Sequence, residues 1–234
     1  MTKRMRFFTV LAILLILALP AWGAKLSRSE ERKKQRELNQ QLFEAARSGS
    51  AQEIAGAVKA GAEINAKNEN GWTALTLAVA NNSPEAVNAV LKAGADVNVK
   101  NDYDGDTALT LAVMHNTLDT VKALLDAKAD VNAATNNGWT PLMLASEREA
   151  IEPIKLLLDA GADINAKDND GMTSLMRAAS YGTPDTVNFL LDAGADAAVK
   201  DSSNETALSY ARENDNLRGT EALKRLESLT QKNE

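Results

Sequence analysis

Few residues in this sequence of 234 could carry out chemistry. There is no cysteine, which excludes disulfides, thiolate catalysis and zinc sites built on cysteine. The single histidine, His115, is the only residue that could serve a Ser-His-Asp triad, and no nucleophile motif lies near it. We therefore interpret His115 as a surface or binding-face residue, and we expect no enzymatic activity and no cofactor.

A second chemically suggestive set is the alternating acidic stretch of Asp102, Asp104 and Asp106. Such carboxylates can bind calcium, but an EF-hand loop needs glycine at its sixth position and glutamate at its twelfth. Counted from Asp102, these positions hold Thr107 and Val113. We therefore interpret the stretch as an acidic turn and not as a metal site.

The first 23 residues have the organisation of a secretory signal peptide. Three basic residues precede the apolar residues 7–19, and Pro20 and the small residues Ala21 and Gly23 follow. This run is shorter than the roughly 20 residues of a membrane-spanning helix, so we expect cleavage after Gly23 or Ala24. The form is typical of bacteria and predicts a periplasmic or secreted protein. The alternative is an inner-membrane anchor formed by residues 7–22.

The net charge is unsuited to nucleic-acid binding. Without residues 1–23, the chain has 23 Lys and Arg against 32 Asp and Glu, a net charge of −9. Phosphate binding depends on clustered cations, and the one basic run, residues 31–37, is mixed with acids. We interpret residues 24–37 as a charged helical leader. We predict no nucleic-acid partner and, beyond the signal segment, no membrane partner.

The rest of the chain is periodic. A Gly-x-Thr-x-Leu motif begins at Gly71, Gly105, Gly138 and Gly171, at spacings of 34, 33 and 33 residues, and Asn204 continues it. A second motif, Gly-Ala-Glu/Asp-Ile/Val-Asn, recurs with the same period. Periods near 33 residues are typical of stacked supersecondary units.

Each unit is predicted to hold two short helices. In the first unit, Thr73 is placed as a helix N-cap, and Ser83 and Pro84 begin the second helix. Gly94 ends that helix in a left-handed conformation, which glycine adopts at little cost. Lys128 holds the equivalent position one unit later, where a residue other than glycine costs about 1 kcal/mol. Helices this short depend on stacking for their stability.

These motifs resemble the ankyrin repeat over residues 38–229. Thr-Pro-Leu at residues 140–142 and the Gly-Ala-Asp turns are family signatures, and five copies in phase make the resemblance specific. It implies an all-α solenoid of helix-turn-helix units with β-turn fingers and helical caps. The expected units are an N-terminal capping repeat (38–70), four repeats (71–104, 105–137, 138–170 and 171–203) and a C-terminal capping repeat (204–234).

The sequence departs from the family after Thr-Pro-Leu, where the family often has a histidine that hydrogen-bonds between units. That position holds Thr76, Thr110, Met143, Met176 and Ser209. We therefore expect weak polar bracing between units, compensated by apolar contacts.

The resemblance also implies a binding surface, because finger tips and first helices line the concave face on which ankyrin proteins bind partners. The position after the motif glycine belongs to that face, and it twice holds tryptophan. Trp139 is the stronger candidate because Arg148 and Tyr181 are near it in the array. The alternative is that the tryptophans shield the stack. The predicted partner-binding residues are Trp72, Trp139, Met172, Asp106, Tyr103, Asn137, His115, Arg148 and Tyr181.

We therefore predict an exported, non-catalytic protein-binding module that is a monomer. Acidic residues at the finger tips favour a partner with a basic patch: Asp102, Asp104, Asp106, Asp168 and Asp170. The alternatives are an inhibitor or immunity-type protein against an exported toxin or enzyme, and a protective factor for an envelope or redox system. An enzyme of unrecognised type is the alternative from another class.

Overall fold

The computed structural model describes residues 27–148 and 150–231, so the predicted signal peptide lies outside the described residues. Apart from the repeats, the chain divides into two compact parts, Met1–Arg36 and Glu37–Glu234. In the first, the described residues 27–36 contain the start of a helix. The second contains all the repeats.

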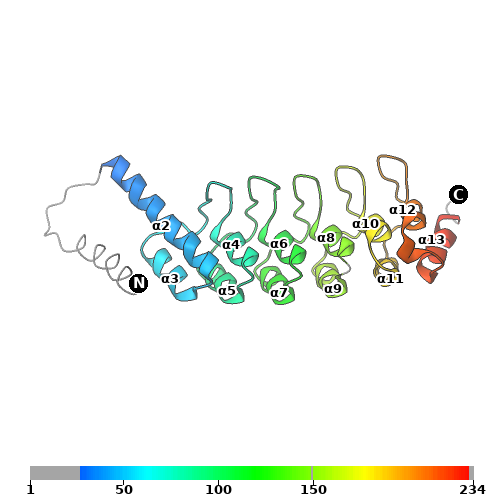
Figure 1. The fold of residues 1–234 in the computed structure, drawn as a ribbon, viewed down its shortest axis with the longest axis horizontal. Coiled ribbons are helices and arrows are strands. Elements are labelled where there is room, and N and C mark those ends of the chain that lie inside the picture. Colours follow the sequence, from blue (N-terminus) through cyan, green and yellow to red (C-terminus); the bar gives the residue numbers. More distant parts are fainter. Residues whose placement is uncertain (1–26, 149, 232–234) are drawn as a thin grey trace, which may run out of the picture. The chain divides into compact units, whose positions relative to one another are not determined.

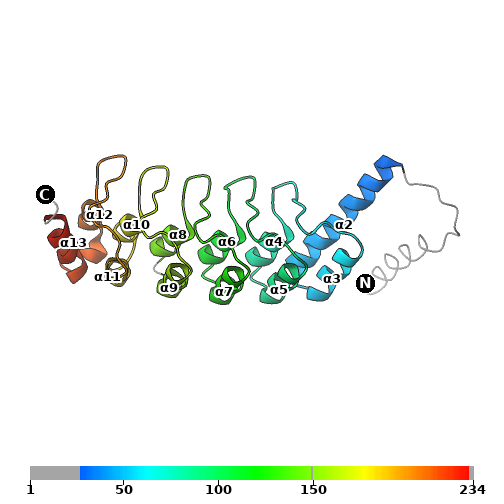
Figure 2. The same cartoon turned by 180° about the vertical axis from the view of Figure 1, so that it is seen from behind.

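The described residues form helix pairs, and no strand occurs among them (Figures 1 and 2). This confirms the predicted all-α repeat architecture. The pairs are α2 (Arg28–Ser48) and α3 (Ala51–Lys59), α4 (Ala74–Ala80) and α5 (Pro84–Lys92), α6 (Ala108–Met114) and α7 (Leu118–Asp126), α8 (Pro141–Glu147) and α9 (Ile151–Asp159), and α10 (Ser174–Tyr181) and α11 (Pro184–Asp192). The last unit has α12 (Ala207–Glu213), the 3-10 helix η1 (Asp215–Leu217) and α13 (Glu221–Gln231).

Five finger loops rise on one side of the helices, each between one pair and the next (Figure 1). We number them finger 1 (residues 61–73), finger 2 (94–107), finger 3 (128–140), finger 4 (161–173) and finger 5 (194–206). A backbone hydrogen bond closes each tip, as from the Asn68 N–H to the Trp72 carbonyl at 2.9 Å. Each finger therefore delivers the residue after the motif glycine to the start of a first helix.

The helix boundaries follow the predicted caps. Thr73 Oγ1 accepts a hydrogen bond from the Thr76 N–H at 3.3 Å, and Ser83 Oγ accepts one from the Ala86 N–H at 3.4 Å. Both N-cap predictions are confirmed. Lys128 has a φ of +68°, which confirms that a lysine occupies the left-handed region after α7.

Two constraints explain the recurring motif glycine. Gly71 and Gly138 have φ angles of +74° and +81°, a region that favours glycine. A Cβ at Gly138 would also lie 2.7 Å from the backbone nitrogen of Asn169 in the next finger. Gly71 is in the same situation against Asp102. The glycine therefore allows successive fingers to pack in direct contact.

The core is a row of aliphatic side chains that repeats from unit to unit. One position of the first helices is at most 1 % exposed in four successive units, and one position of the second helices is fully buried in the same four. The first-helix residues are Leu75, Leu109, Leu142 and Leu175, and the second-helix residues are Val90, Leu124, Leu157 and Leu190. Each helix thus buries its apolar face against neighbouring units, as short helices require.

A row of asparagines, which we call the asparagine ladder, braces the turns between units. The side-chain oxygen of each accepts a hydrogen bond from a backbone N–H at 2.8–2.9 Å, and in four of the five pairs that N–H belongs to the next unit. The expectation of weak polar bracing is therefore wrong at the turns. The asparagine side chains supply hydrogen bonds there, in place of the family histidine that this sequence lacks. The pairs are Asn39 with Glu63, Asn65 with Asp96, Asn98 with Asp130, Asn132 with Asp163 and Asn165 with Asp196.

Candidate partner-binding face

The face of interest consists of the fingers and the first helices α4, α6, α8, α10 and α12, and we call it the finger face. The position after the motif glycine lies next to the N-cap of each first helix. Trp72, Trp139 and Met172 are half-buried there and pack against the apolar core. Glu205 is exposed, and Asp106 is only 6 % exposed. This position therefore does not present one continuous row of accessible side chains.

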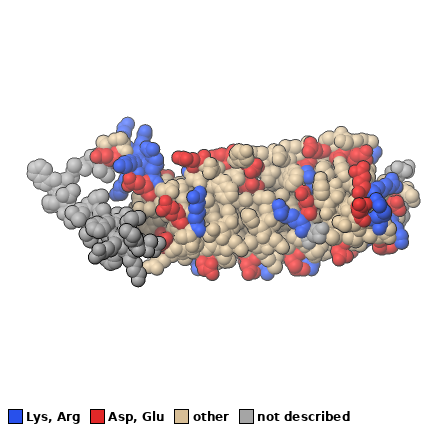
Figure 3. Space-filling view, in the orientation of Figure 1, with Lys and Arg blue, Asp and Glu red and all other residues tan. Residues whose placement is uncertain are grey.

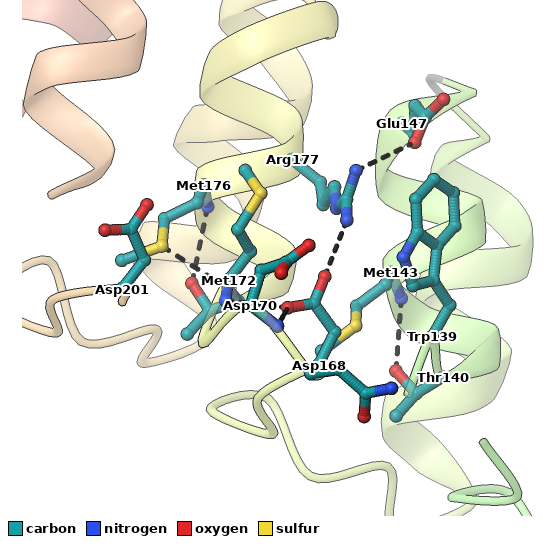
Figure 4. Close-up of polar contacts among 12 residues, drawn as sticks. Trp139, Thr140, Met143, Glu147, Asp168, Asp170, Met172, Met176, Arg177 and Asp201 are labelled. Atoms are coloured by element: carbon teal, nitrogen blue, oxygen red, sulfur yellow. Dashed lines mark hydrogen bonds and ion pairs between the residues drawn. The ribbon is translucent and has the colours of Figure 1, made fainter. Parts of the chain in front are cut away.

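Trp139 lies in a cluster of charged side chains between two units (Figure 4). The Arg177 guanidinium of α10 is stacked over the indole, 3.8 Å from the ring centroid. Its Nη2 donates to Asp168 Oδ2 at 2.6 Å, and Nη1 lies 3.9 Å from Glu147 Oε2. The side chains of Arg177 and Asp168 are 8 % and 0 % exposed. The contact over this indole is thus supplied from within the protein.

Asp168 also organises finger 4. Its Oδ1 accepts hydrogen bonds from the Asp170 and Met172 N–H groups at 3.0 and 2.9 Å. One carboxylate therefore shapes the finger tip with one oxygen and holds Arg177 with the other. A buried charge needs such partners, because an isolated one is costly to remove from water.

Two of the five acidic residues predicted at the finger tips are buried, which corrects that prediction. Asp168 is paired with Arg177, and Asp106 accepts a hydrogen bond from Thr110 Oγ1 at 3.1 Å. Burial raises the pKa of Asp106, with the Thr110 hydrogen bond acting against the rise and the Asp104 charge adding to it. Asp106 therefore supports α6 and is not offered to a partner.

Trp72 lies beside a cavity of about 520 Å³. Its aromatic and apolar lining comes from Trp72, Leu77 and Tyr103, and the Tyr103 side chain at the tip of finger 2 is 82 % exposed. The remaining lining residues are polar or charged: Arg47, Asn68, Glu69, Asn70, Asp102 and Asp104. Four elements meet here, namely finger 1, finger 2, helix α4 and the end of α2.

The other predicted residues do not line this cavity. His115 and Arg148 are the exposed C-cap residues of α6 and α8, and Tyr181, at 58 % exposure, ends α10. Asn137 is exposed on finger 3, where its carbonyl accepts from the Asn169 N–H. The structure thus brings Trp72 and Tyr103 together and leaves these four residues elsewhere.

Within residues 27–148 and 150–231, no group of three or more His, Cys, Asp or Glu side chains is arranged to hold a metal ion. Over the same residues, none of the helices combines the length and the apolar character needed to cross a bilayer.

Models of ankyrin repeats match residues 29–101, 80–168 and 157–211. The chain belongs to the ankyrin-repeat family. Ankyrin repeats are generally non-catalytic modules for protein–protein interaction, so this ankyrin array has the architecture of a binding protein. A comparison with curated proteins finds no match to the chain.

Arg177 is the residue of this face that sequence reasoning missed. It occupies a position held by Leu77, Leu111 and Leu144 in the preceding units. A charged residue in an otherwise apolar position indicates a buried ionic partner, and Asp168 lies nine residues earlier. That signal was present in the aligned repeats.

Proposed function

We propose that this ankyrin protein is an exported, non-catalytic module that binds a protein partner on the finger face, around Trp72 and Tyr103. The observation that supports this most is that Tyr103 is 82 % exposed and lines a cavity together with a second aromatic residue, Trp72. Binding sites are typically concave and lined by aromatic side chains, and tyrosine and tryptophan dominate the binding energy of many interfaces.

Export is part of the proposal because residues 1–23 have the features of a signal peptide. Expression of the full chain in a bacterium, followed by fractionation and mass spectrometry of the N-terminus, tests it. We expect a periplasmic or secreted protein that begins at Ala24 or Lys25. An intact N-terminus in the membrane fraction would support the inner-membrane anchor instead.

Affinity capture from the extracellular and periplasmic fractions of the source cells tests binding. We expect the wild type to retain a protein that Tyr103→Ala loses. Tyr181→Ala is the matched control, because it also removes an exposed tyrosine but lies outside the cavity. Equal retention by all three proteins would contradict a contact centred on Tyr103. Retention of a toxin or a secreted enzyme whose activity falls on binding would favour the inhibitor alternative.

A further inference from the structure

The two tryptophans at equivalent finger positions differ in their surroundings. The Arg177 guanidinium is stacked over the Trp139 indole and forms ion pairs with Asp168 and Glu147. The three equivalent positions around Trp72 hold uncharged residues, namely Leu111, Asn101 and Ala80. The internal cation present at Trp139 therefore has no counterpart at Trp72, and among the described residues no cation–π contact involves Trp72.

The cavity lies beside the tryptophan that lacks this cation, and carboxylates border it. Glu69 and Asp104 are exposed on fingers 1 and 2, and neither forms an ion pair with any described residue. Asp102 is paired with Lys67 at 2.6 Å. In Figure 3, acidic side chains lie along the edge of the array where the fingers are, and others lie along the opposite edge. The rim therefore offers two unpaired negative charges close to an aromatic ring.

Arg47 is the one cation among the residues that line the cavity, and it comes from α2. Three carboxylates from the fingers outnumber it. An anionic occupant would meet these three charges, whereas a cationic one would pair with two that have no partner. The net charge of the lining thus favours a cationic occupant, and the positive charge of Arg47 reduces this preference.

We propose that this cavity binds an arginine side chain of the partner protein, stacked on Trp72 and paired with Glu69 and Asp104. The partner would thus repeat between two proteins the arrangement that Arg177 makes with Trp139 inside one. Guanidinium groups suit this role because they stack on aromatic rings and pair with carboxylates at once. The inference rests on the proposed function and adds the chemistry of the partner's contact.

Peptide titration of the purified protein tests the inference directly. The probe is acetyl-Gly-Arg-Gly-amide, and its neutral counterpart has citrulline, which has nearly the same shape, in place of arginine. The readout is the indole N–H signal of Trp72 in ¹H–¹⁵N spectra, assigned with Trp72→Phe. We expect a saturable shift with the arginine peptide, roughly fivefold weaker binding of the citrulline peptide, and no shift at Trp139.

Exposed charges supply variants that leave the fold unchanged. Glu69→Gln combined with Asp104→Asn should weaken arginine-peptide binding roughly fivefold, and Arg47→Gln should strengthen it. Asp170→Asn is the matched control, because it removes an exposed finger-tip carboxylate outside the cavity. Weaker binding by the Glu69→Gln/Asp104→Asn variant together with stronger binding by Arg47→Gln would show that the cavity recognises a cation, because stacking alone would not depend on these charges.

Equal affinity for the arginine and citrulline peptides would overturn the inference, as would the absence of any saturable shift at Trp72. These results are separable from a failure of the proposed function. If Tyr103→Ala abolishes capture of the partner while Glu69→Gln/Asp104→Asn leaves it intact, the finger face binds a protein but the cavity does not bind its arginine.

Discussion

Lys128 shows how a single residue can act against the repeat that contains it. Positive φ angles occur among the described residues at glycines, at three asparagines and at Lys128. Asparagine tolerates the left-handed region better than most residues, whereas a lysine there brings its Cβ close to the backbone. The equivalent positions in neighbouring units are Gly94 and Gly161, with φ of +86° and +90°. Lys128 therefore adopts a glycine conformation without the freedom of glycine.

We expect Lys128→Gly to raise the free energy of unfolding by about 1 kcal/mol, because it removes this backbone strain. For a chain of this size, the melting temperature should rise by about 2–4 °C in calorimetry. The reverse change, Gly94→Lys, is the control, since nothing lies within 4 Å of the added Cβ and only the backbone is strained. An unchanged or lower melting temperature for Lys128→Gly would contradict the explanation.

At the scale of the element, the residue whose N–H closes each finger tip, which we call the finger base, is coupled to one position of the first helix that follows. Where the base holds an asparagine or threonine, as at Asn68, that position is a leucine. Where it holds an aspartate, the helix supplies a donor to the second carboxylate oxygen: Arg177 for Asp168 and Tyr210 for Asp201. The hydrogen bond to Asp201 raises the pKa of Tyr210 to about 12, so the hydroxyl remains a donor over the physiological pH range.

We expect Arg177→Leu alone to destabilise the protein by about 3–5 kcal/mol, because it leaves the buried Asp168 carboxylate without its cation. Adding Asp168→Asn recreates the leucine–asparagine pair of the first repeat, Leu77 with Asn68. The double variant should therefore recover most of the loss. Denaturant unfolding of the wild type, both single variants and the double variant measures the coupling. Additive losses would show that finger base and helix are independent.

At the scale of the molecule, each unit of the array depends on its neighbours, so the ends need their own covers. Helix α13 packs against α11 and α12 and buries Ala222 and Leu226 completely. Stability in such an array is a sum of unit and interface contributions, and the loss of an end affects the nearest unit first.

A chain that ends after Asn214 should show this in hydrogen exchange. We expect the amides of α12 and α11 to exchange faster by about tenfold or more, because the interface with α13 is lost. Amides of α4 and α6 should keep their wild-type rates. Lys224→Ala, an exposed change on α13, serves as the control. A uniform increase over the whole array would indicate that it unfolds as one cooperative body.

Local chemistry made much of this fold predictable from the sequence. The N-caps at Thr73 and Ser83 and the left-handed Lys128 depend on residues within a few positions of one another, and the period follows from the repetition of such short motifs. The Arg177 stack on Trp139 and the asparagine ladder join residues far apart in the sequence, from 24 positions for Asn39 and Glu63 to 38 for Trp139 and Arg177. The helical period within one unit predicts which apolar faces meet, whereas each polar pair between units depends on two distant residues at once.

The asparagine ladder also determines where the chain tolerates a change of length. Its partners are 31 residues apart between Asn65 and Asp96, but 32 apart between Asn98 and Asp130. Both bonds are 2.8 Å long, so the additional residue of finger 2 leaves the ladder in register. A finger tip can thus gain residues without disturbing its neighbours. This makes the tips the natural places for a lineage to diversify, or for a protein engineer to graft a new recognition loop.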